Sequence, residues 1–174
     1  MTAKKDCSGG IFITSQRICK KILSDLALRK PTKQSSTFAI YTAEYAVDGN
    51  YGTDLIDDQC THTDTNDINP WWMVDLQTVN FITSGGIYPS VRIVNRGPDS
   101  WGSDSSDRLR DVTVTAGLTE STVSIVCGFF AGPGTASQVV IIDCPTTPEG
   151  RFVKISKTTE YLSLCEVDVF GVAV

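Results

Sequence analysis

The stretch Trp71-Trp72-Met73-Val74-Asp75-Leu76 is a short run of large apolar and β-branched residues that begins directly after Pro70. Similar runs recur from Leu26 onward, with clusters of Gly, Pro, Asn, Asp and Ser between them. They lie at residues 91–94, 112–115, 123–126, 139–143, 152–156 and 166–170. Many short strands divided by turn residues are typical of antiparallel sandwiches and barrels. The sequence therefore predicts an all-β fold.

Length and charge narrow the class of protein. The chain has 174 residues, enough for one domain with a sizeable core but too few for two ordinary domains. Its 15 basic and 20 acidic residues give a net charge of −5, which argues against nucleic acid and anionic membranes as partners. No apolar run is long enough to span a membrane, so we expect no membrane insertion.

The chain divides near residue 25. We expect an N-terminal extension at residues 1–25 and one domain at residues 26–174. Apolar residues of the segment 18–26 recur at helical spacing, which predicts a short helix there. The segment Met1–Lys5 lacks the apolar core of a signal peptide. We expect that a leader was removed from the mature chain; the alternative is an unconventional route of export.

Six cysteines bear on the redox compartment. None sits in a C-x-x-C pair and the chain has a single histidine, which weighs against a zinc site. An even number of cysteines favours a disulfide framework and an extracellular, oxidising location. Composition leaves the pairing open. The cysteines are Cys7, Cys19, Cys60, Cys127, Cys144 and Cys165.

Enzyme signatures are missing from the sequence. It has no phosphate-binding Gly loop, no H-E-x-x-H and no G-x-S-x-G. The histidine, His62, lies in Cys60-Thr61-His62-Thr63 and has no sequence neighbours that suggest a catalytic triad. We therefore expect a binding protein and not an enzyme.

The loop Asn95–Arg110 is rich in Asp, Ser and Gly and contains Arg96, Arg108 and Arg110. Arginine presents a rigid fork of donors, and a neutral histidine donates from one ring nitrogen. His62 with two of these arginines would form a donor-rich pocket for an uncharged ligand that is rich in acceptors, such as a sugar. The alternative is that the arginines are solvated and offset the aspartates of the loop.

Two further features of the loops allow more than one interpretation. Trp101 stands among polar residues, where its ring either stacks on a sugar or covers the loop. The turn Asp48-Gly49-Asn50, the pair Asp57-Asp58 and Glu166 supply oxygen ligands that suit Ca²⁺, although no EF-hand spacing is present. The alternative for the turn is an ordinary Asp-Gly turn.

Eight motifs, taken in order over residues 26–171, resemble the F-type lectins, or fucolectins. That family has the fold of discoidin and coagulation-factor C-type domains. The resemblance implies an eight-stranded antiparallel jelly-roll β-sandwich with its ligand site in loops at one end. The motifs lie at residues 26–36, 46–50, 60–63, 70–76, 94–96, 108–109, 150–153 and 164–171.

The resemblance also implies a sugar site. His62, Arg96 and Arg108 match the family's sugar-binding triad, and Leu55 and Ile56 stand where the family places apolar groups against the methyl group of fucose. In the family the two arginines lie closer together, around an adjacent Cys-Cys disulfide. Here they are 12 positions apart and residues 97–107 contain no cysteine, so Trp101 is our candidate to replace that disulfide. The stretch before Arg96 is also longer than usual, through residues 84–90.

A structural Ca²⁺ site and a disulfide scheme follow from the same resemblance. The implied pairs are Cys60–Cys165 and Cys127–Cys144, which leaves Cys7–Cys19. The ion would be held by the side chains of two acidic residues and by main-chain oxygens of their neighbours. The implied ligands are Asp48 and Glu166 by side chain, and Tyr45, Asn50, Gln59 and Cys165 by main chain.

The sequence thus predicts a secreted, non-enzymatic lectin for L-fucose-containing glycans, acting in innate immune recognition or cell adhesion. Weak binding of one sugar would call for several sites, by homo-oligomerisation or by repetition in a longer chain. One alternative is an adhesion module of the same fold that has lost fucose binding and binds protein or another glycan. Another is a carbohydrate module cut from a larger enzyme or coat protein.

Overall fold

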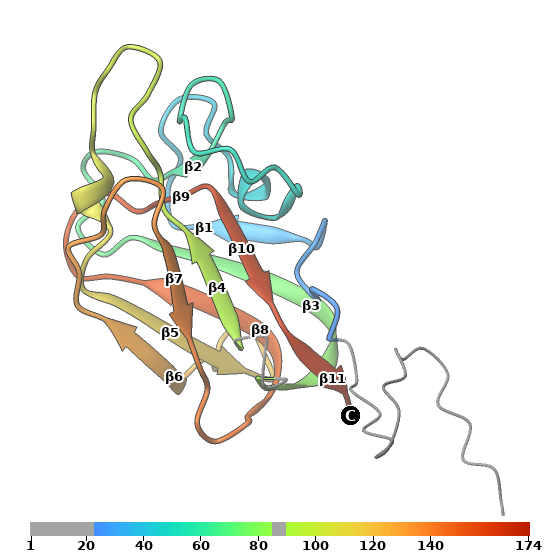
Figure 1. The fold of residues 1–174 in the computed structure, drawn as a ribbon. Coiled ribbons are helices and arrows are strands. Elements are labelled where there is room, and N and C mark those ends of the chain that lie inside the picture. The colour runs from blue at the N-terminus through green and yellow to red at the C-terminus, as the bar shows by residue number, and fades with distance from the viewer. Residues whose placement is uncertain (1–22, 85–89) are drawn as a thin grey trace, which may run out of the picture.

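The computed structural model describes residues 23–84 and 90–174, which form an antiparallel β-sandwich (Figure 1). Two short 3-10 helices, η1 (Ala43–Val47) and η2 (Ser106–Arg108), lie in the loops. The strands are β1 (Thr32–Gln34), β2 (Thr61–His62), β3 (Trp71–Ile82), β4 (Val91–Val94), β5 (Val112–Gly117), β6 (Ile125–Phe130), β7 (Val139–Ile142), β8 (Glu149–Ser156), β9 (Ser163–Leu164), β10 (Glu166–Val169) and β11 (Gly171–Ala173).

Two main sheets make the layers of the sandwich. The larger sheet has the order β1-β3-β8-β5-β6, and β11 adds to β3. The smaller sheet has the order β10-β4-β7 and faces it, as Figure 1 shows. A two-stranded ribbon, β2-β9, lies near one end of the sandwich, beside the longest loops. That end carries the residues of the predicted sugar site.

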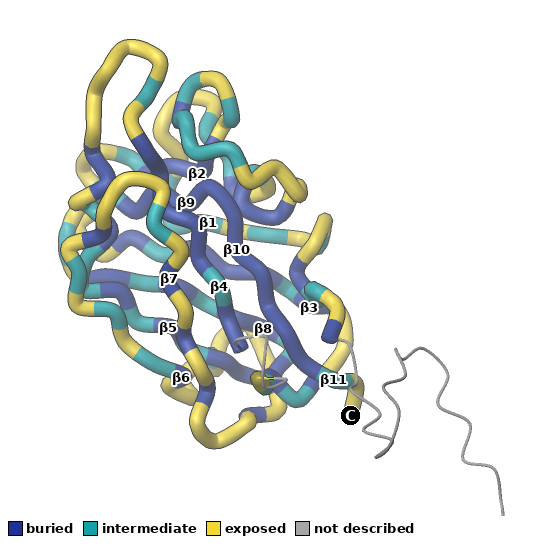
Figure 2. The backbone as a smooth tube through the Cα atoms, viewed as in Figure 1, coloured by how far each residue is buried: buried dark blue, intermediate teal, exposed yellow. Residues whose placement is uncertain are grey.

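The core lies between the two sheets and follows the alternation of the strands. Trp72, Val74 and Leu76 of β3 are almost fully buried, and so are Ile93 of β4 and Val167 of β10. Figure 2 shows this buried interior in dark blue, with exposed segments in the loops and along the edge strands β6 and β7. Burying each such side chain contributes about 1.5–3 kcal/mol, so the facing sheets supply most of the stabilisation.

The adjacent tryptophans of β3 point to opposite faces of the strand. Trp72 is fully buried and its Nε1–H donates to the carbonyl of Ala43 at 2.8 Å. Trp71 is half-buried on the outer face. The pair therefore fixes which face of β3 meets the core.

The all-β antiparallel prediction is confirmed, but the number of strands differs from the expected eight. The described residues contain eleven strands, because short pairings of two or three residues, such as β1, β2, β9 and β11, extend the sheets at their ends. No helix in the described part of the chain is long and apolar enough to cross a membrane.

The predicted helix at residues 18–26 is wrong in the part that the structure describes. Asp25 forms an isolated antiparallel bridge with Phe170, and its carboxylate accepts hydrogen bonds at 2.9 Å from the amides of Ala27 and Val169. These contacts with the last strands outweigh the weak helical preference of so short a segment. Residues 18–22, and the rest of the predicted extension up to residue 22, lie outside the described residues.

Two disulfides are present among the described residues, in the pairing that the resemblance implies. Cys60–Cys165 links the loop before β2 to the segment between β9 and β10. Cys127–Cys144 links β6 to the residues after β7, and so joins the edges of the two main sheets. Cys7 and Cys19 lie outside the described residues, and so does most of the longer stretch at residues 84–90.

Candidate ligand-binding site

The loops at one end of the sandwich enclose a cavity of about 230 Å³. His62 reaches it from β2, Arg96 from the segment that follows β4, and Arg108 from the end of η2. The structure thus brings the three predicted polar residues together in one cavity, although they are far apart in the sequence. The lining is completed by Phe38, Leu55, Thr65, Asp99, Ser103, Ser105 and Tyr161.

The His62 imidazole is buried, and its protonation state follows from its neighbours. Nδ1 lies 2.6 Å from the carbonyl oxygen of Thr63, which can only accept a hydrogen bond, so Nδ1 carries the hydrogen. Burial lowers the pKa of His62, and the positive charges of Arg96 and Arg108 lower it further. The neutral ring therefore leaves Nε2 as an acceptor. The expected role of His62 as a donor is reversed, because its N–H is already used by the protein.

Arg96 is only 3% exposed, and its guanidinium is incompletely paired. Nη2 lies 3.4 Å from Oδ2 of Asp99, and the buried Nε has no hydrogen-bond partner. Burial lowers the pKa of Arg96, with a further contribution from Arg108, but a guanidinium remains charged in proteins. The cavity therefore contains a buried cation with an unused donor.

Arg108 lies over an aromatic ring that no sequence motif had indicated. Its guanidinium carbon is 4.6 Å from the centroid of the Tyr161 ring. Such cation–π stacking holds the planar fork in place. Tyr161 and Phe38 also flank the His62 ring, at centroid distances of 6.0 and 5.4 Å. Aromatic rings thus form part of the cavity wall.

The loop between the two arginines folds back on Asp99. Its carboxylate Oδ1 accepts hydrogen bonds from the amides of Trp101 and Ser103, at 3.2 and 2.9 Å. The amide of Gly102 donates to the Asp99 carbonyl at 2.7 Å, with Gly102 at a φ of +83° that suits glycine. This fold-back keeps Arg96 and Arg108 on the same cavity across the cysteine-free loop.

The remaining predicted sugar contacts divide into two groups. Leu55 is 8% exposed and lines the cavity, but Ile56 does not. The Trp101 side chain is 85% exposed and does not line the cavity either. Arg110 pairs with Asp107 at 2.6 Å and points away from the site, as expected. Tyr161, Phe38 and Asp99, which do line it, carried no recognisable sequence signal.

Glu166, which belongs to the predicted Ca²⁺ site, is fully buried on β10. Oε1 accepts a hydrogen bond from the amide of Gly49 at 3.1 Å, whereas Oε2 has no partner. Burial raises the pKa of Glu166 to about 8, and the charges of Asp168 and Asp48 add to the shift. The turn that contains Asp48 and the carboxylate of Glu166 therefore do meet in the fold.

Three of the predicted main-chain ligands, Asn50, Gln59 and Cys165, are sequence neighbours of groups that the fold brings to Glu166. Gln59 directly precedes Cys60, and the disulfide Cys60–Cys165 therefore holds it near the start of β10 in space. Asn50 donates from its amide group to the carbonyl of Asp58 at 3.2 Å, which closes the loop, and Tyr45 lies in η1 just before the turn. No group of three or more His, Cys, Asp or Glu side chains among the described residues could hold a metal. A cation here would thus depend on carbonyls.

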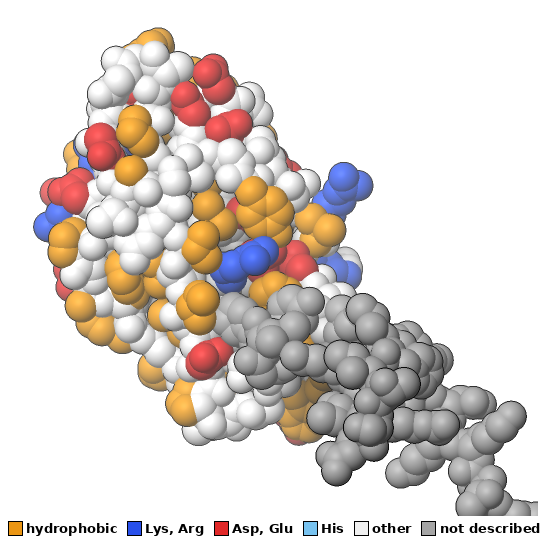
Figure 3. Space-filling model, in the orientation of Figure 1, with side chains coloured by type: hydrophobic (Ala, Val, Ile, Leu, Met, Phe, Trp, Pro, Cys, Tyr) orange, Lys and Arg blue, Asp and Glu red, His pale blue; other side chains and the backbone are white. Residues whose placement is uncertain are grey.

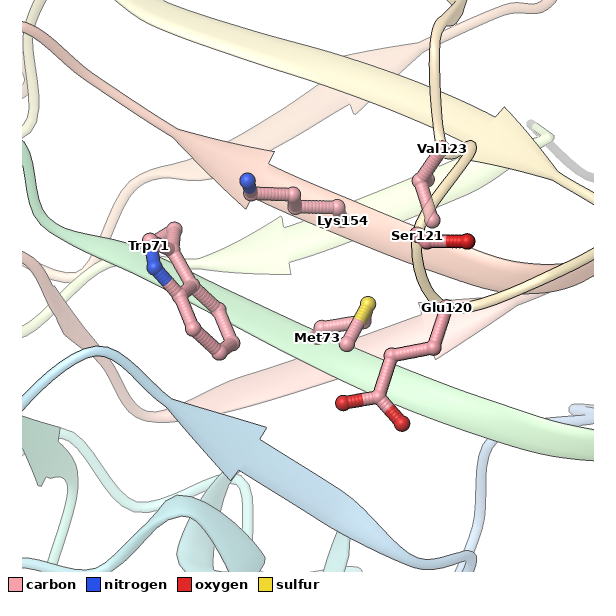
Figure 4. Close-up of a pocket in the computed structure, with 6 residues that line it drawn as sticks. All are labelled: Trp71, Met73, Glu120, Ser121, Val123 and Lys154. Atoms are coloured by element: carbon pink, nitrogen blue, oxygen red, sulfur yellow. The ribbon is translucent and has the colours of Figure 1, made fainter.

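A second hollow, of about 220 Å³, lies on the outer face of the larger sheet (Figure 4). Lys154 of β8 places its ammonium 5.1 Å from the ring centroid of Trp71, and Glu120 forms an ion pair with Lys33 at 2.6 Å. Its charged groups therefore already have partners within the protein. The cavity at the end of the sandwich, with its unpaired donor and its available acceptor, is the better candidate. Acidic side chains gather on the loops around that end in Figure 3.

Comparison with known proteins agrees with this fold. The family model of the F5/F8 type C, NedA-like, galactose-binding domain matches residues 45–155. The chain belongs to this family of β-sandwich domains.

Within that class the chain belongs to the fucolectins, or F-type lectins. It is 37% identical to fucolectin-5 of Anguilla japonica over 128 residues, which are 72% of this chain and 61% of that protein. It is 33% identical to fucolectin-6 of the same eel over 154 residues, 85% of this chain and 76% of the relative. The chain therefore spans less than two thirds of fucolectin-5.

Solved structures of lectins are similar to the chain along most of its length. The lectin domain of lectinolysin, complexed with Lewis b antigen, is 31% identical with a TM-score of 0.67, and the match covers 86% of this chain and 98% of that one. The fucolectin from striped bass (Morone saxatilis) serum is 30% identical with a TM-score of 0.68, over 87% and 50% of the two chains.

Proposed function

We propose that this protein is a secreted lectin that binds L-fucose-containing glycans in the cavity formed by His62, Arg96 and Arg108, without catalysing a reaction. The observation that carries the proposal is that His62, Arg96 and Arg108, far apart in the sequence, line one cavity. Arg96 has one long side-chain hydrogen bond there, to Asp99 at 3.4 Å, and a ligand hydroxyl would improve the pairing of this buried cation. The fucolectin relatives and the lectin structure with bound Lewis b antigen support a fucosylated ligand.

The polar groups of the cavity suit a neutral sugar. Nε2 of His62 accepts a hydroxyl hydrogen, and the guanidinium groups of Arg96 and Arg108 donate to hydroxyl or ring oxygens. Asp99 adds a carboxylate that can accept a second hydroxyl hydrogen. Donors and acceptors thus lie side by side in the cavity. This arrangement suits adjacent sugar hydroxyl groups, because each hydroxyl can donate one hydrogen bond and accept another.

Apolar contacts supply the preference for a 6-deoxy sugar. Leu55 lines the cavity and is our candidate contact for the methyl group. Burying one methyl is worth about 0.8 kcal/mol, so this contact alone gives only a modest preference over galactose. Ile56 and the exposed ring of Trp101 lie outside the cavity, where they are available to further sugars of a larger glycan.

We further propose that Ca²⁺ binds beside Glu166 and stabilises the loop of residues 48–60 without touching the sugar. The partnerless Oε2 of Glu166 and its unfavourable burial are what a cation would correct. Asp48 would be the second carboxylate ligand. The carbonyls of Tyr45, Asn50, Gln59 and Cys165 would complete the coordination.

The test is calorimetry with L-fucose on the purified chain and its single variants. We expect dissociation constants in the high-micromolar to millimolar range, typical of a monosaccharide with few contacts. His62→Ala, Arg96→Ala and Arg108→Ala should each lose measurable binding, because a lost charged donor costs about 1.5–3 kcal/mol. Arg110→Ala is the matched control, since Arg110 leaves the same loop but pairs with Asp107 outside the cavity.

A glycan array with and without EDTA complements the calorimetry. Binding of fucosylated glycans by the parent chain supports the lectin. A parent that binds no fucosylated glycan contradicts it and favours the adhesion module with a protein partner. The array also shows whether the weak single site needs several copies of the chain for useful avidity.

A further inference from the structure

Lys157 directly follows β8 and is buried behind the wall of the cavity, with only 5% of its surface exposed. Lysine is almost never buried without a partner. Its Nζ donates to the carbonyl of Arg108 at 2.6 Å and to the carbonyl of Tyr161 at 3.0 Å. Among the described residues, Lys157 makes no ion pair.

The two carbonyls belong to residues whose side chains also contact each other. Arg108 ends η2, in the loop from β4 to β5, whereas Tyr161 lies between β8 and β9. The guanidinium of Arg108 stacks on the Tyr161 ring, with its Cζ 4.6 Å from the ring centroid. The ammonium of Lys157 joins the same two residues by their backbone carbonyls. Both side chains line the cavity, and Lys157 does not.

We propose that Lys157 is a positioning residue of the sugar site, which holds Arg108 and Tyr161 at the separation that their stacking and the bound sugar require. This inference rests on the proposed function of the cavity. The buried Lys157 side chain links the Arg108 and Tyr161 segments by hydrogen bonds. Lys157 thus adds two hydrogen bonds, one to the backbone of each segment, to the stacking of Arg108 on the Tyr161 ring.

The surrounding charges fit a role that depends on hydrogen bonding more than on charge. Arg110, Asp111, Glu160 and Arg108 act on Lys157 from both segments. Burial lowers its pKa to about 8, with the repulsion of Arg110 added. The neutral amine that forms above that pH still carries two N–H donors, one for each carbonyl. The crosslink therefore persists in either protonation state.

The first test compares Lys157→Met with Arg151→Met by calorimetry with L-fucose, well below the melting temperature of each variant. Methionine keeps an unbranched side chain, one atom shorter than that of lysine, but donates to neither carbonyl. Arg151 lies on β8 and pairs with Asp75, outside the cavity, so its variant controls for general loss of stability. We expect about tenfold weaker binding for Lys157→Met, the loss typical of one strong hydrogen bond, and unchanged binding for Arg151→Met.

A spectroscopic measurement separates positioning from stability. Because the Arg108 guanidinium lies over the Tyr161 ring, ring currents should shift the NMR signal of its Nε–H in the parent. That shift should collapse in Lys157→Met and stay in Arg151→Met. Equal L-fucose affinity of the parent and Lys157→Met, or an unmoved Arg108 signal, overturns the inference. A parent that does not bind L-fucose overturns both this inference and the proposed function.

A second measurement needs no variant, and it tests the role of Lys157 even if Lys157→Met fails to fold. In the parent chain with isotope-labelled lysine, saturation with L-fucose should shift the side-chain signal of Lys157, which lies behind Arg108 and Tyr161. The signal of Lys154, on the outer face of the sheet, serves as the control. A Lys157 signal that stays in place while L-fucose binds contradicts the role.

Discussion

The two loops that flank the cavity are held in shape by different means. The loop of residues 48–60 is fixed by the disulfide Cys60–Cys165 and by the hydrogen bond from Gly49 to Glu166. The loop of residues 97–107 has no covalent link and folds around the carboxylate of Asp99. The first loop is anchored by a covalent bond, whereas the second is held by hydrogen bonds, those to Asp99 and a buried one from Asn95 Nδ2 to the Ser106 carbonyl at 2.9 Å. A single side chain should therefore reshape the second loop while the first tolerates the same kind of change.

The largest expected effect is on the covalent anchor. Replacing Cys60 and Cys165 together by Ala opens a loop with a sequence separation of 105, for which chain entropy gives about 4–5 kcal/mol of lost stability. Denaturant unfolding of the double variant measures it. The matched control replaces Cys127 and Cys144, with a separation of 17, and should lose about 3 kcal/mol. A larger loss in the control would reverse the ranking of the two anchors.

The second effect concerns the proposed Ca²⁺ site beside the same loop. Ca²⁺ present at about 100 times its dissociation constant should stabilise the parent by about 2.7 kcal/mol, because it binds only the native state. Melting curves in Ca²⁺ and in EDTA measure this shift. Glu166→Gln, which resembles the protonated acid, should melt at the same temperature in both. Identical curves for the parent would remove the proposed site.

The third effect concerns the loop without a disulfide. Asp99→Ala removes the acceptor of two amides and the partner of Arg96, so L-fucose should bind about tenfold more weakly. Stability should change much less than in the disulfide variant. Asp107→Ala, in the same loop but paired with Arg110 in solvent, should leave both quantities unchanged. Equal effects of the two variants would show that Asp99 does not organise the site.

The smallest effect is that of pH on the histidine between the loops. The pKa of His62 in the native protein is lowered below its usual value of 6.5, so the unfolded chain takes up the proton first. Stability is therefore retained above pH 6.5 and falls as the pH drops toward the native pKa. Sugar affinity should fall in the same direction, since protonation turns Nε2 from an acceptor into a donor beside two arginines. Calorimetry from pH 7.5 to 5 measures this.

A control for that titration is Asp99→Asn, which removes the nearby carboxylate. The same decline of affinity in this variant assigns the pH dependence to the imidazole. Loss of the decline would assign it to Asp99 instead.

The alternation of the strands and the motifs made the fold and three site residues predictable. WWMVDL at residues 71–76 forms the start of β3, and His62, Arg96 and Arg108 reach one cavity. The direction of the His62 hydrogen bond was beyond the sequence, because it depends on the Thr63 carbonyl in space. Tyr161 and Lys157 were missed for the same reason, since their partners are distant in the chain. Trp101 could not be placed, because the fold-back on Asp99 decides where its ring points.

The positions of the two ends of the domain determine how the cavity is oriented when the domain is attached to a surface or to another chain. Near residue 25 the chain pairs with Phe170, and β11 pairs with the last residues of β3, so both ends of the described domain lie away from the cavity (Figure 1). A tether attached at either end would hold the domain by its base, with the cavity facing outward. Several copies carried on one stalk or one surface could then engage neighbouring branches of a glycan without obstructing one another.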